Sequence, residues 1–545
     1  MITAEPRARR PRLSRFLAGL AVAAIGLGAA VASETTAARA ASYEPITGTG
    51  STWSENAIKQ WQRNVAGLYG MQINYSGVGS SAGRRDFIAG SVDFAVSEIP
   101  FQSRPEDGSA PEKPPRGYAY MPIVAGGTAF MYNLKINGKR VTNLRLSGDT
   151  ISKIFTGKIT KWDDPQIEKD NPGLSMPSKT IVPVLRSDGS GSTAQFTLWM
   201  SKQHSSTWNA FCKSVGRASP CGLTSQYPGF DGAKLQNGSS GVAGYVSQDN
   251  GEGSITYVEY SYALKSGFPV AKVLNSAGYY VEPTQYAVAV ALLKARINDN
   301  PRSADYLTQI LDGVYNNSDP RTYPLSSYSY LIVPTETGGV FTKAKGGTLG
   351  AFGKYLLCEG QQQAGDLGYS PLPMNLVEAG FTQVKRIPGA SGVKVSLNDC
   401  NNPTFKAGDS PSKNQLAQIA PMPAKCDKQG ADQCTTGTAG AAGTKTDVTG
   451  SGSGGASSGA PEATGGSGGS GESAGGTDIG GGDEVVAGPA AVGGTATASP
   501  FTLPSSGWGA EQMLMLAAVI LLALAMVVPP LLRARPQARP GKETP

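Results

Sequence analysis

The amino-acid sequence predicts an α/β fold divided into two lobes, and two observations carry this prediction. Short strand-like runs alternate with helical runs along residues 41–434, a pattern typical of mainly parallel sheets covered by helices. A folded body of about 390 residues is also large for a single hydrophobic core. We therefore expect two α/β lobes rather than one domain.

The expected elements follow one another along this body as strand, loop and helix. Strands are expected at residues 72–76, 91–96, 118–124, 129–133, 181–185 and 329–333. Helices are expected at residues 55–66, 82–90, 192–202 and 284–298. Helices between strands provide the crossover connections that parallel strands need.

The composition excludes several classes of protein. The chain has 545 residues, a net charge of +7, one histidine and 16% charged residues. A single histidine excludes zinc centres built from several histidines and most histidine-dependent relays, so no metal or cofactor is expected. The low share of charged residues argues against a nucleic-acid partner. Glycine, with 71 residues, is about twice as frequent as usual, which indicates a low-complexity stretch beside the folded part.

The first 40 residues have the order of parts found in a secretory signal peptide. Arginines lie at positions 7, 9, 10, 12 and 15, and residues 16–32 are uncharged and apolar. Ala38-Arg39-Ala40 then offers the small residues of a cleavage site. An N-terminal membrane anchor is the alternative, but the apolar run is shorter than the roughly 18 residues that a span requires. We expect the protein to be exported.

The C-terminal part predicts a tether and a membrane anchor. Residues 435–504 consist mainly of glycine, alanine, serine and threonine, and such a linker cannot bury enough apolar surface to fold. As a coil it would span roughly 45 Å. Within residues 505–545, positions 513–532 are uncharged and precede several arginines, which predicts a transmembrane helix with a basic cytoplasmic tail. The body would then remain on the extracellular face of the cell membrane.

A possible signal for attachment to the cell wall lies just before this predicted span. The segment Leu503-Pro504-Ser505-Ser506-Gly507 is similar to a sortase sorting signal, with Ser506 where that signal has threonine. The alternative is a simple turn beside the membrane. Wall linkage and membrane anchoring both keep the protein outside the cell.

Six cysteines in an exported chain predict disulfide bonds. Six cysteines allow 15 connectivities, so the pairing stays open at this point. Two pairs are close in sequence, namely Cys212 with Cys221 and Cys426 with Cys434. This arrangement leaves Cys358 and Cys400 as the third pair.

Three predicted helix starts are rich in glycine and hydroxyl residues, at residues 48–54, 77–83 and 186–193. The first N–H groups of a helix are unsatisfied, and the helix dipole favours negative charge there. Together with Arg186, three such starts would form a donor-rich site for a tetrahedral oxyanion. The alternative is that each serine or threonine only caps its own helix.

Six segments in a fixed order resemble a known family. They read ITGTGSTW, INYSGVGSSAG, VDFAVSE, IFTGKITKWDD, LRSDGSGST and YVEYSYA. Together they are similar to the phosphate-binding proteins of Pst-type ABC phosphate importers. The resemblance implies the periplasmic-binding-protein type II fold, in which a hinge joins lobe one (46–124 and 283–420) to lobe two (125–282). It also implies a protein that captures inorganic phosphate without chemistry and delivers it to ABC transporter permease subunits. We expect a monomer.

The resemblance also implies the residues of the phosphate site. Matched motif by motif, the binding groups are the side chains or backbone N–H groups of Thr52, Trp53, Ser80, Arg186, Ser190, Gly191 and Ser192. Asp188 would support Arg186. Glu98 stands where the family has an aspartate that accepts a hydrogen bond from the ligand's own proton. Phosphate carries such a proton near neutral pH and sulfate does not, so this acid would reject sulfate. Glutamate is one methylene longer, which leaves selectivity against other oxyanions such as arsenate open.

Two functions of other classes compete with phosphate capture. Residues 79–83 match the G-x-S-x-G pattern of serine hydrolases, with Ser81 as nucleophile and His204 as the only possible histidine base. This pattern arises often by chance in chains rich in glycine and serine, and a lone motif is weak evidence. A surface adhesion or wall-binding role would suit the tether equally well.

Overall fold

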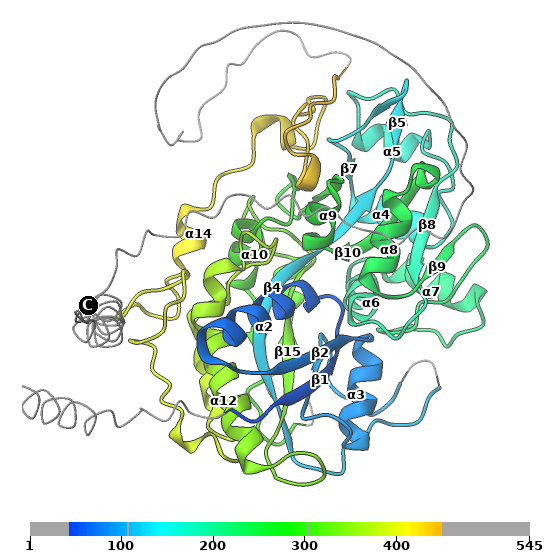
Figure 1. The fold of residues 1–545 in the computed structure, drawn as a ribbon. Helices are drawn as coiled ribbons and strands as arrows, with labels where there is room; N and C mark the ends of the chain where they lie inside the picture. The colour runs from blue at the N-terminus through cyan, green and yellow to red at the C-terminus, as the bar shows by residue number, and fades with distance from the viewer. Residues whose placement is uncertain (1–42, 106–107, 304–305, 307, 449–545) are drawn as a thin grey trace, which may run out of the picture. The chain divides into compact units, whose positions relative to one another are not determined.

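The strand β4 (Tyr118–Tyr132) passes through both halves of the fold and joins them (Figure 1). This computed structural model describes residues 43–448, except 106–107, 304–305 and 307. The first part of β4 pairs antiparallel with β15 (Ser326–Pro334), and its last part pairs antiparallel with β10 (Ser254–Glu259). The two strands expected at 118–124 and 129–133 are therefore one strand shared by the two lobes.

Gly126 and Gly127 suggest a break in this strand by sequence, yet the strand continues through them. A Cβ atom at Gly126 would lie 2.8 Å from the ring of Trp53, and one at Gly127 would lie 2.5 Å from Pro283. Glycine is needed here because neighbouring side chains approach the backbone closely. The two glycines thus allow close packing where β4 passes from one lobe to the other.

Lobe one is built on the strand order β2-β1-β3-β15-β4. β1 (Ile46–Gly50) pairs in parallel with β2 (Ile73–Gly77) and β3 (Phe94–Ser97), whereas β15 pairs antiparallel with β3 and β4. The helices of this lobe are α2 (Glu55–Tyr69), α3 (Ser80–Ala89), α10 (Gln285–Leu292), α11 (Asp312–Tyr315), α12 (Lys343–Leu357) and α13 (Met374–Val384). The buried residues of α2 recur at helical spacing, so its amphipathic face lies against the sheet.

Lobe two continues the sheet from β4 through β10, β8 (Val182–Arg186) and β9 (Lys234–Gln236). The last three strands are parallel to one another, and β11 (Val270–Leu274) pairs with β4, β7 (Arg145–Leu146) and β12 (Tyr280–Val281). Its helices are α4 (Gly148–Phe155), α5 (Pro165–Asp170), α6 (Gly191–Gln203), α7 (Ser205–Ser214), α8 (Gly238–Ser247) and α9 (Tyr260–Ser266). The expectation of two α/β lobes is confirmed.

Short elements complete the part of the chain that the structure describes. They are the strand pairs β5 (Lys135–Ile136) with β6 (Lys139–Arg140) and β13 (Arg296–Ile297) with β14 (Gln309–Ile310), the helix α14 (Gln415–Ile419), and the 3₁₀ turns Asp249–Gly251, Glu359–Gln363, Ala390–Gly392, Lys425–Asp427 and Ala439–Ala441. The helix expected at 284–298 ends early, at Leu292, because the chain beyond it leaves the core and pairs as β13.

The folded chain continues to Val448, so the prediction that an unfolded linker begins at residue 435 is wrong at its start. The Thr438 side chain is buried and donates to the backbone oxygen of Val270 at 2.6 Å. A Cβ atom at Gly440 would lie 2.6 Å from the backbone of Gly267. The small residues that suggested a coil therefore allow this segment to pack tightly against α9 in lobe two.

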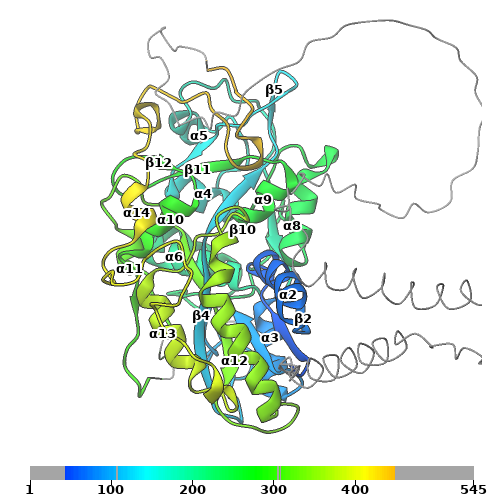
Figure 2. The same ribbon diagram turned by 60° about the vertical axis from the view of Figure 1, so that its left-hand side comes forward.

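The segment after residue 387 crosses from lobe one to lobe two, and Figure 2 shows α14 beside α10. On lobe one, the Cys358–Cys400 disulfide attaches it to the end of α12. On lobe two, Asp427 forms an ion pair with Lys272 at 2.8 Å. The other disulfides are Cys212–Cys221 and Cys426–Cys434, so the predicted disulfide bonds are confirmed and the structure gives the pairing that the sequence left open.

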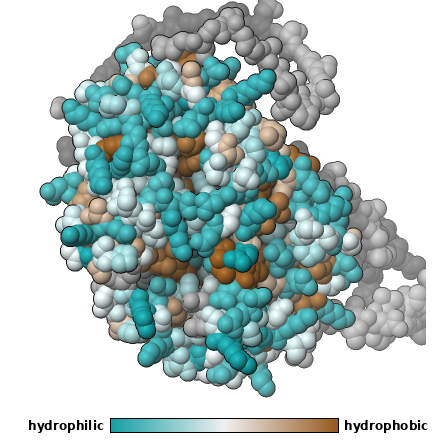
Figure 3. All heavy atoms as spheres, turned by 180° about the vertical axis from the view of Figure 1, so that it is seen from behind, coloured by the Kyte–Doolittle hydropathy of each residue, from teal (hydrophilic) through white to brown (hydrophobic). Residues whose placement is uncertain are grey.

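The predicted signal peptide, the predicted span at 513–532 and the sorting-like segment at 503–507 all lie outside the described residues. Within residues 43–448, apart from the gaps given above, no helix is both long enough and apolar enough to cross a membrane. On the face seen in Figure 3, hydrophilic residues predominate and hydrophobic ones form small groups between them. The large hydrophobic side chains gather instead in the core of the two lobes.

Candidate functional site

Four helices begin where parallel strands end, and their starts meet between the lobes. In lobe one α2 follows β1 and α3 follows β2, and in lobe two α6 follows β8 and α8 follows β9. Loops at the carboxyl ends of such strands are the usual ligand sites of α/β folds. Helix N-termini placed there favour an anion. Three of the four are the predicted starts, and α8 is a fourth.

Thr52 connects the two lobes by its side chain. Its Oγ1 accepts hydrogen bonds from Nη2 of Arg186 at 3.0 Å and from the backbone N–H of Ser239 at 3.1 Å. It also shares a hydrogen bond with the Ser239 hydroxyl at 2.8 Å. Thr52 is 5% exposed and Arg186 is 2% exposed. The predicted residues Thr52 and Arg186 are therefore brought together in a site closed to solvent.

Arg186 is paired with Asp188, as the sequence motif implied. Nε of Arg186 donates to Asp188 Oδ1 at 2.7 Å, and its Nη2 donates to Oδ2. Burial acts to raise the pKa of Asp188, but the hydrogen bonds and charge of Arg186 and the N–H of Gly238 outweigh it and lower that pKa. The Asp188 carboxylate already neutralises the charge of Arg186. The guanidinium would therefore contribute to anion binding mainly through its directed hydrogen-bond donors, and less through its net positive charge.

Glu98 lies at the end of β3, with its carboxylate held by hydroxyl groups. Ser51 and Ser329 both donate to Oε1, the latter at 2.6 Å, and Ser80 donates to Oε2 at 2.7 Å. The Ser80 hydroxyl also accepts the N–H of Gly191 from lobe two at 3.1 Å. Glu98 is 1% exposed. The predicted trio of Ser80, Glu98 and Gly191 thus forms one contact between the lobes.

The other predicted groups lie around these two clusters. The N–H of Trp53 donates to the Ser51 hydroxyl at 2.9 Å, and the Ser190 hydroxyl accepts the N–H of Thr193. Ser192 is buried, and its hydroxyl has no hydrogen-bond partner among the described residues. A buried donor of this kind is costly unless a ligand or water meets it.

Simple helix capping explains only one of the three predicted starts. Ser190 caps α6 by its side chain, whereas Ser54 before α2 and Gly79 before α3 make no side-chain cap. The hydroxyls of Ser51, Thr52 and Ser80 are directed to other site residues instead. Their placement therefore favours a ligand site over capping.

Sequence reasoning missed three residues of the site: Ser51, Ser239 and Ser329. Ser51 lies inside the first predicted start but was not singled out. Ser239 follows Asn237-Gly238, the same kind of glycine and hydroxyl pattern as the other starts, so this signal could have been found. Ser329 lies within a strand, where no local pattern marks it.

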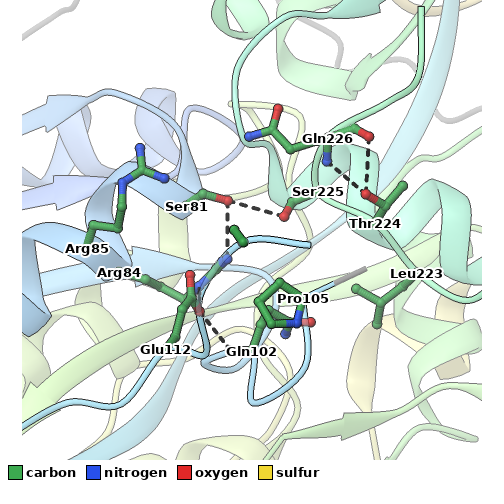
Figure 4. Close-up of a pocket in the computed structure, with 11 residues that line it drawn as sticks. Ser81, Arg84, Arg85, Gln102, Pro105, Glu112, Leu223, Thr224, Ser225 and Gln226 are labelled. Carbon is green, nitrogen blue, oxygen red and sulfur yellow. Dashed lines mark hydrogen bonds and ion pairs between the residues drawn. The ribbon is translucent and has the colours of Figure 1, made fainter. Parts of the chain in front are cut away.

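A cavity of about 210 Å³ opens beside the site, between α3 and the loop at residues 223–226 (Figure 4). Ser81 lies at its inner wall, donating to the Ser225 hydroxyl at 3.2 Å and accepting from Nη2 of Arg84. The backbone N–H of Ser81 donates to Gly189 across the lobes at 3.0 Å. Ser81 thus takes part in the contact between the two lobes.

The hydrolase alternative requires Ser81 to contact His204, but the two side chains contact different residues. His204 ends α6 and packs edge-on against Trp199, with ring centroids 4.7 Å apart. Burial lowers the pKa of His204, and the charge of Asp149 opposes that shift. The hydrogen-bond partners of the Ser81 side chain are Arg84 and Ser225. No serine–histidine pair is formed among the described residues.

Comparisons with known proteins show which family the sequence belongs to. Residues 35–359 match the family model of a PBP superfamily domain. The phosphate-binding protein PstS of Xylella fastidiosa strain Temecula1 is 34% identical over 333 residues, which cover 61% of this chain and 83% of that protein. The phosphate-binding protein PstS of Pasteurella multocida strain Pm70 is 31% identical over 343 residues, covering 62% of this chain and 88% of that protein.

Solved structures are similar at lower identity. A high-affinity periplasmic phosphate-binding protein bound with phosphate is 20% identical, with a TM-score of 0.48, and the match covers 66% of this chain and 100% of that chain.

Proposed function

The chain belongs to the family of PstS phosphate-binding proteins within the PBP superfamily, and we propose that it captures inorganic phosphate between its lobes and delivers it to an ABC importer. Capture and release make and break no covalent bond. The protein is therefore a binding protein and not an enzyme.

The observation that carries this proposal is the meeting of four helix starts in one buried, hydroxyl-rich site. Hydroxyl groups reach it from Thr52 and Ser80 in lobe one and from Ser192 and Ser239 in lobe two, and each of these residues is at most 5% exposed. Short donors that converge from several sides suit a tetrahedral oxyanion, whose four oxygens point in different directions. The unpartnered Ser192 hydroxyl is one donor that such a ligand would satisfy.

The charges of the site favour an oxyanion that brings its own proton. Two carboxylates, Asp188 and Glu98, accompany the single guanidinium of Arg186, and Asp188 is paired with it. An oxygen of a fully deprotonated dianion would face the Glu98 carboxylate with no proton between them. The two negative groups would repel each other strongly in a buried site. Phosphate can place its remaining proton there. We propose Glu98 as the acceptor of this proton.

Delivery requires the lobes to separate. In the structure they are in contact through the pairs Thr52–Arg186 and Ser80–Gly191, so the site is reached only when these hydrogen bonds break. Hinge motion about β4, the strand that the two lobes share, is the movement that the topology allows,. An importer that binds the open form more tightly than the closed form would release the ligand.

We further propose that the C-terminal part tethers the protein to the extracellular face of the membrane. The uncharged positions 513–532 and the basic tail support a membrane anchor,. The linker would begin after Val448, the last residue that the structure describes. Fractionation of cells that express either the full chain or a chain ending at residue 448 tests this proposal. The full chain should stay with the membranes, and the short chain should appear in the medium.

The decisive experiment is calorimetric titration of the purified protein with phosphate and with sulfate at pH 7. A ligand of five heavy atoms is expected to bind with a Kd on the order of micromolar. The Glu98→Gln variant removes the charge and should lower the phosphate-over-sulfate preference by at least about tenfold. Glu378→Gln, an exposed change on α13, is the matched control. Absence of heat with phosphate in the parent protein would contradict the proposal.

A further inference from the structure

We propose that Ser329 is a positioning residue that holds the Glu98 carboxylate in place and thereby sets the preference for oxyanions that carry a proton. The inference rests on the proposed function, because it concerns the selectivity of the same site. It assigns part of that selectivity to a residue on β15, outside the four helix starts.

The carboxylate of Glu98 is held unevenly by its three hydroxyl donors. Oε1 accepts two hydrogen bonds, from Ser51 and Ser329, whereas Oε2 accepts one, from Ser80. Oε2 also faces the start of α6, since a Cβ atom at Gly191 would lie 1.9 Å from it. The less occupied oxygen is therefore the one directed at lobe two, where a ligand proton would be accepted.

The backbone of Glu98 is tied to the same strand as its side chain. Its carbonyl oxygen accepts hydrogen bonds from Nε2 of Gln195 at 2.7 Å and from Nε2 of Gln309 at 3.1 Å. Gln309 in turn accepts the N–H of Tyr328 at 3.0 Å and donates to the Tyr328 carbonyl. Glu98 is thus connected to β15 twice, through Ser329 directly and through Gln309.

The pairing of β4 with β15 is irregular beside Ser329, and the bulge lies in β4. Ser329 pairs with Val124 of β4 but the next residue, Tyr330, pairs with Pro122, so Ile123 is the extra residue of a bulge. The carbonyl oxygen of Ile123 accepts from Gln361 at 2.8 Å, and Pro122 has no N–H to leave unpaired. Bulges commonly redirect a side chain beside a functional site. This one accompanies the side chain that reaches Glu98.

Removing the Ser329 hydroxyl would leave Oε1 with one donor and let the carboxylate rotate. A rotated carboxylate would no longer be held where it repels an unprotonated oxygen of the ligand. The protein would then discriminate less well between phosphate and sulfate. The change would affect the ratio of phosphate and sulfate affinities more than phosphate affinity alone, because the hydroxyl and N–H donors of the site remain.

The experiment compares Ser329→Ala with Ser327→Ala in the full-length protein by competition titration of phosphate against sulfate. Ser327 is the matched control because it lies on the same strand, is buried, and its hydroxyl has no partner among the described residues. Ser329→Ala should lower the phosphate-over-sulfate preference at least about tenfold, as expected for a hydrogen bond to a charged group. Ser327→Ala should leave it unchanged. Ser329→Thr, which keeps a hydroxyl, should restore most of the preference.

The possible outcomes separate this inference from the proposed function. An unchanged preference in Ser329→Ala, with phosphate still bound, would overturn the inference and leave phosphate capture intact. Loss of preference in Ser327→Ala to the same extent would also overturn it, because packing of the strand would then be the cause. Failure of the parent protein to bind phosphate would overturn the proposed function itself. If Ser329→Ala does not fold, Ser329→Cys, with its weaker donor, gives the same comparison.

Discussion

The guanidinium of Arg186 in lobe two donates a hydrogen bond at 3.0 Å to the hydroxyl of Thr52 in lobe one. The two residues are 134 positions apart in the chain; Arg186 is the last residue of β8 in lobe two, and Thr52 follows the end of β1 in lobe one. Their contact means that two of the proposed ligand-binding groups also hold the lobes together. If both bind the ligand as we propose, we expect ligand affinity and lobe closure to be coupled.

Replacing Arg186 by alanine should weaken phosphate binding more than tenfold. The variant removes donors to Thr52, Ser239 and the ligand, and it leaves Asp188 buried without its partner,. Calorimetric titration with phosphate measures the effect. Arg386→Ala, an exposed change at the end of α13, should bind as the parent does. An unchanged Kd in Arg186→Ala would remove this residue from the site.

Replacing Asp188 by asparagine should lower stability in a way that depends on pH. The pKa of Asp188 is lowered in the folded protein, so its contribution is present above the unfolded pKa of about 3.9 and is lost as pH falls through the folded value. At pH 7 the variant should be less stable by about 3–5 kcal/mol, since Arg186 is left buried and unpaired.

Chemical denaturation of the parent and of Asp188→Asn at several pH values tests this prediction. The difference in free energy of unfolding should shrink as the pH falls below about 4. A difference that stays constant down to pH 2 would mean that the Asp188 charge does not stabilise the fold.

The Cys358–Cys400 disulfide should contribute more to stability than the other two bridges. It closes a loop with a sequence separation of 42, against 9 and 8 for the others. Loop-closure entropy predicts that replacing both cysteines by alanine costs about 4 kcal/mol. Thermal unfolding should show a lower midpoint than in a matched Cys212→Ala/Cys221→Ala protein. Equal midpoints for the two double variants would contradict the loop-length argument.

A chain that ends at residue 434 should be less stable than one that ends at residue 448. The shorter chain lacks Thr438 and Ala439, whose hydrogen bonds reach Val270 and Glu282 in lobe two. It would also expose the surface of α9 that Gly440 covers. Hydrogen exchange of α9 and thermal unfolding compare the two chains. The same midpoint for both would restore the original placement of the linker at residue 435.

Local patterns predicted most of the α/β elements, because hydrophobic periodicity and glycine-rich loops can be recognised from residues close together in the sequence. The failures have physical causes in distant parts of the chain. β4 continues through Gly126 because Trp53 packs against it, and residues 435–448 fold because α9 offers a close-fitting surface. Neither neighbour is visible in the local sequence.

The sequence by itself determined the cysteines available for pairing and the loop residues that open three of the four helices, and the export signals remain a prediction from it. Those features depend on residue type and short spacing alone. Only the tertiary structure decided that Glu98 is held by Ser51 and Ser329, that Thr52 contacts Arg186, and that α8 supplies the fourth helix start. These relationships join residues far apart in the chain, and they arise only when the sheet brings distant strands and the two lobes together.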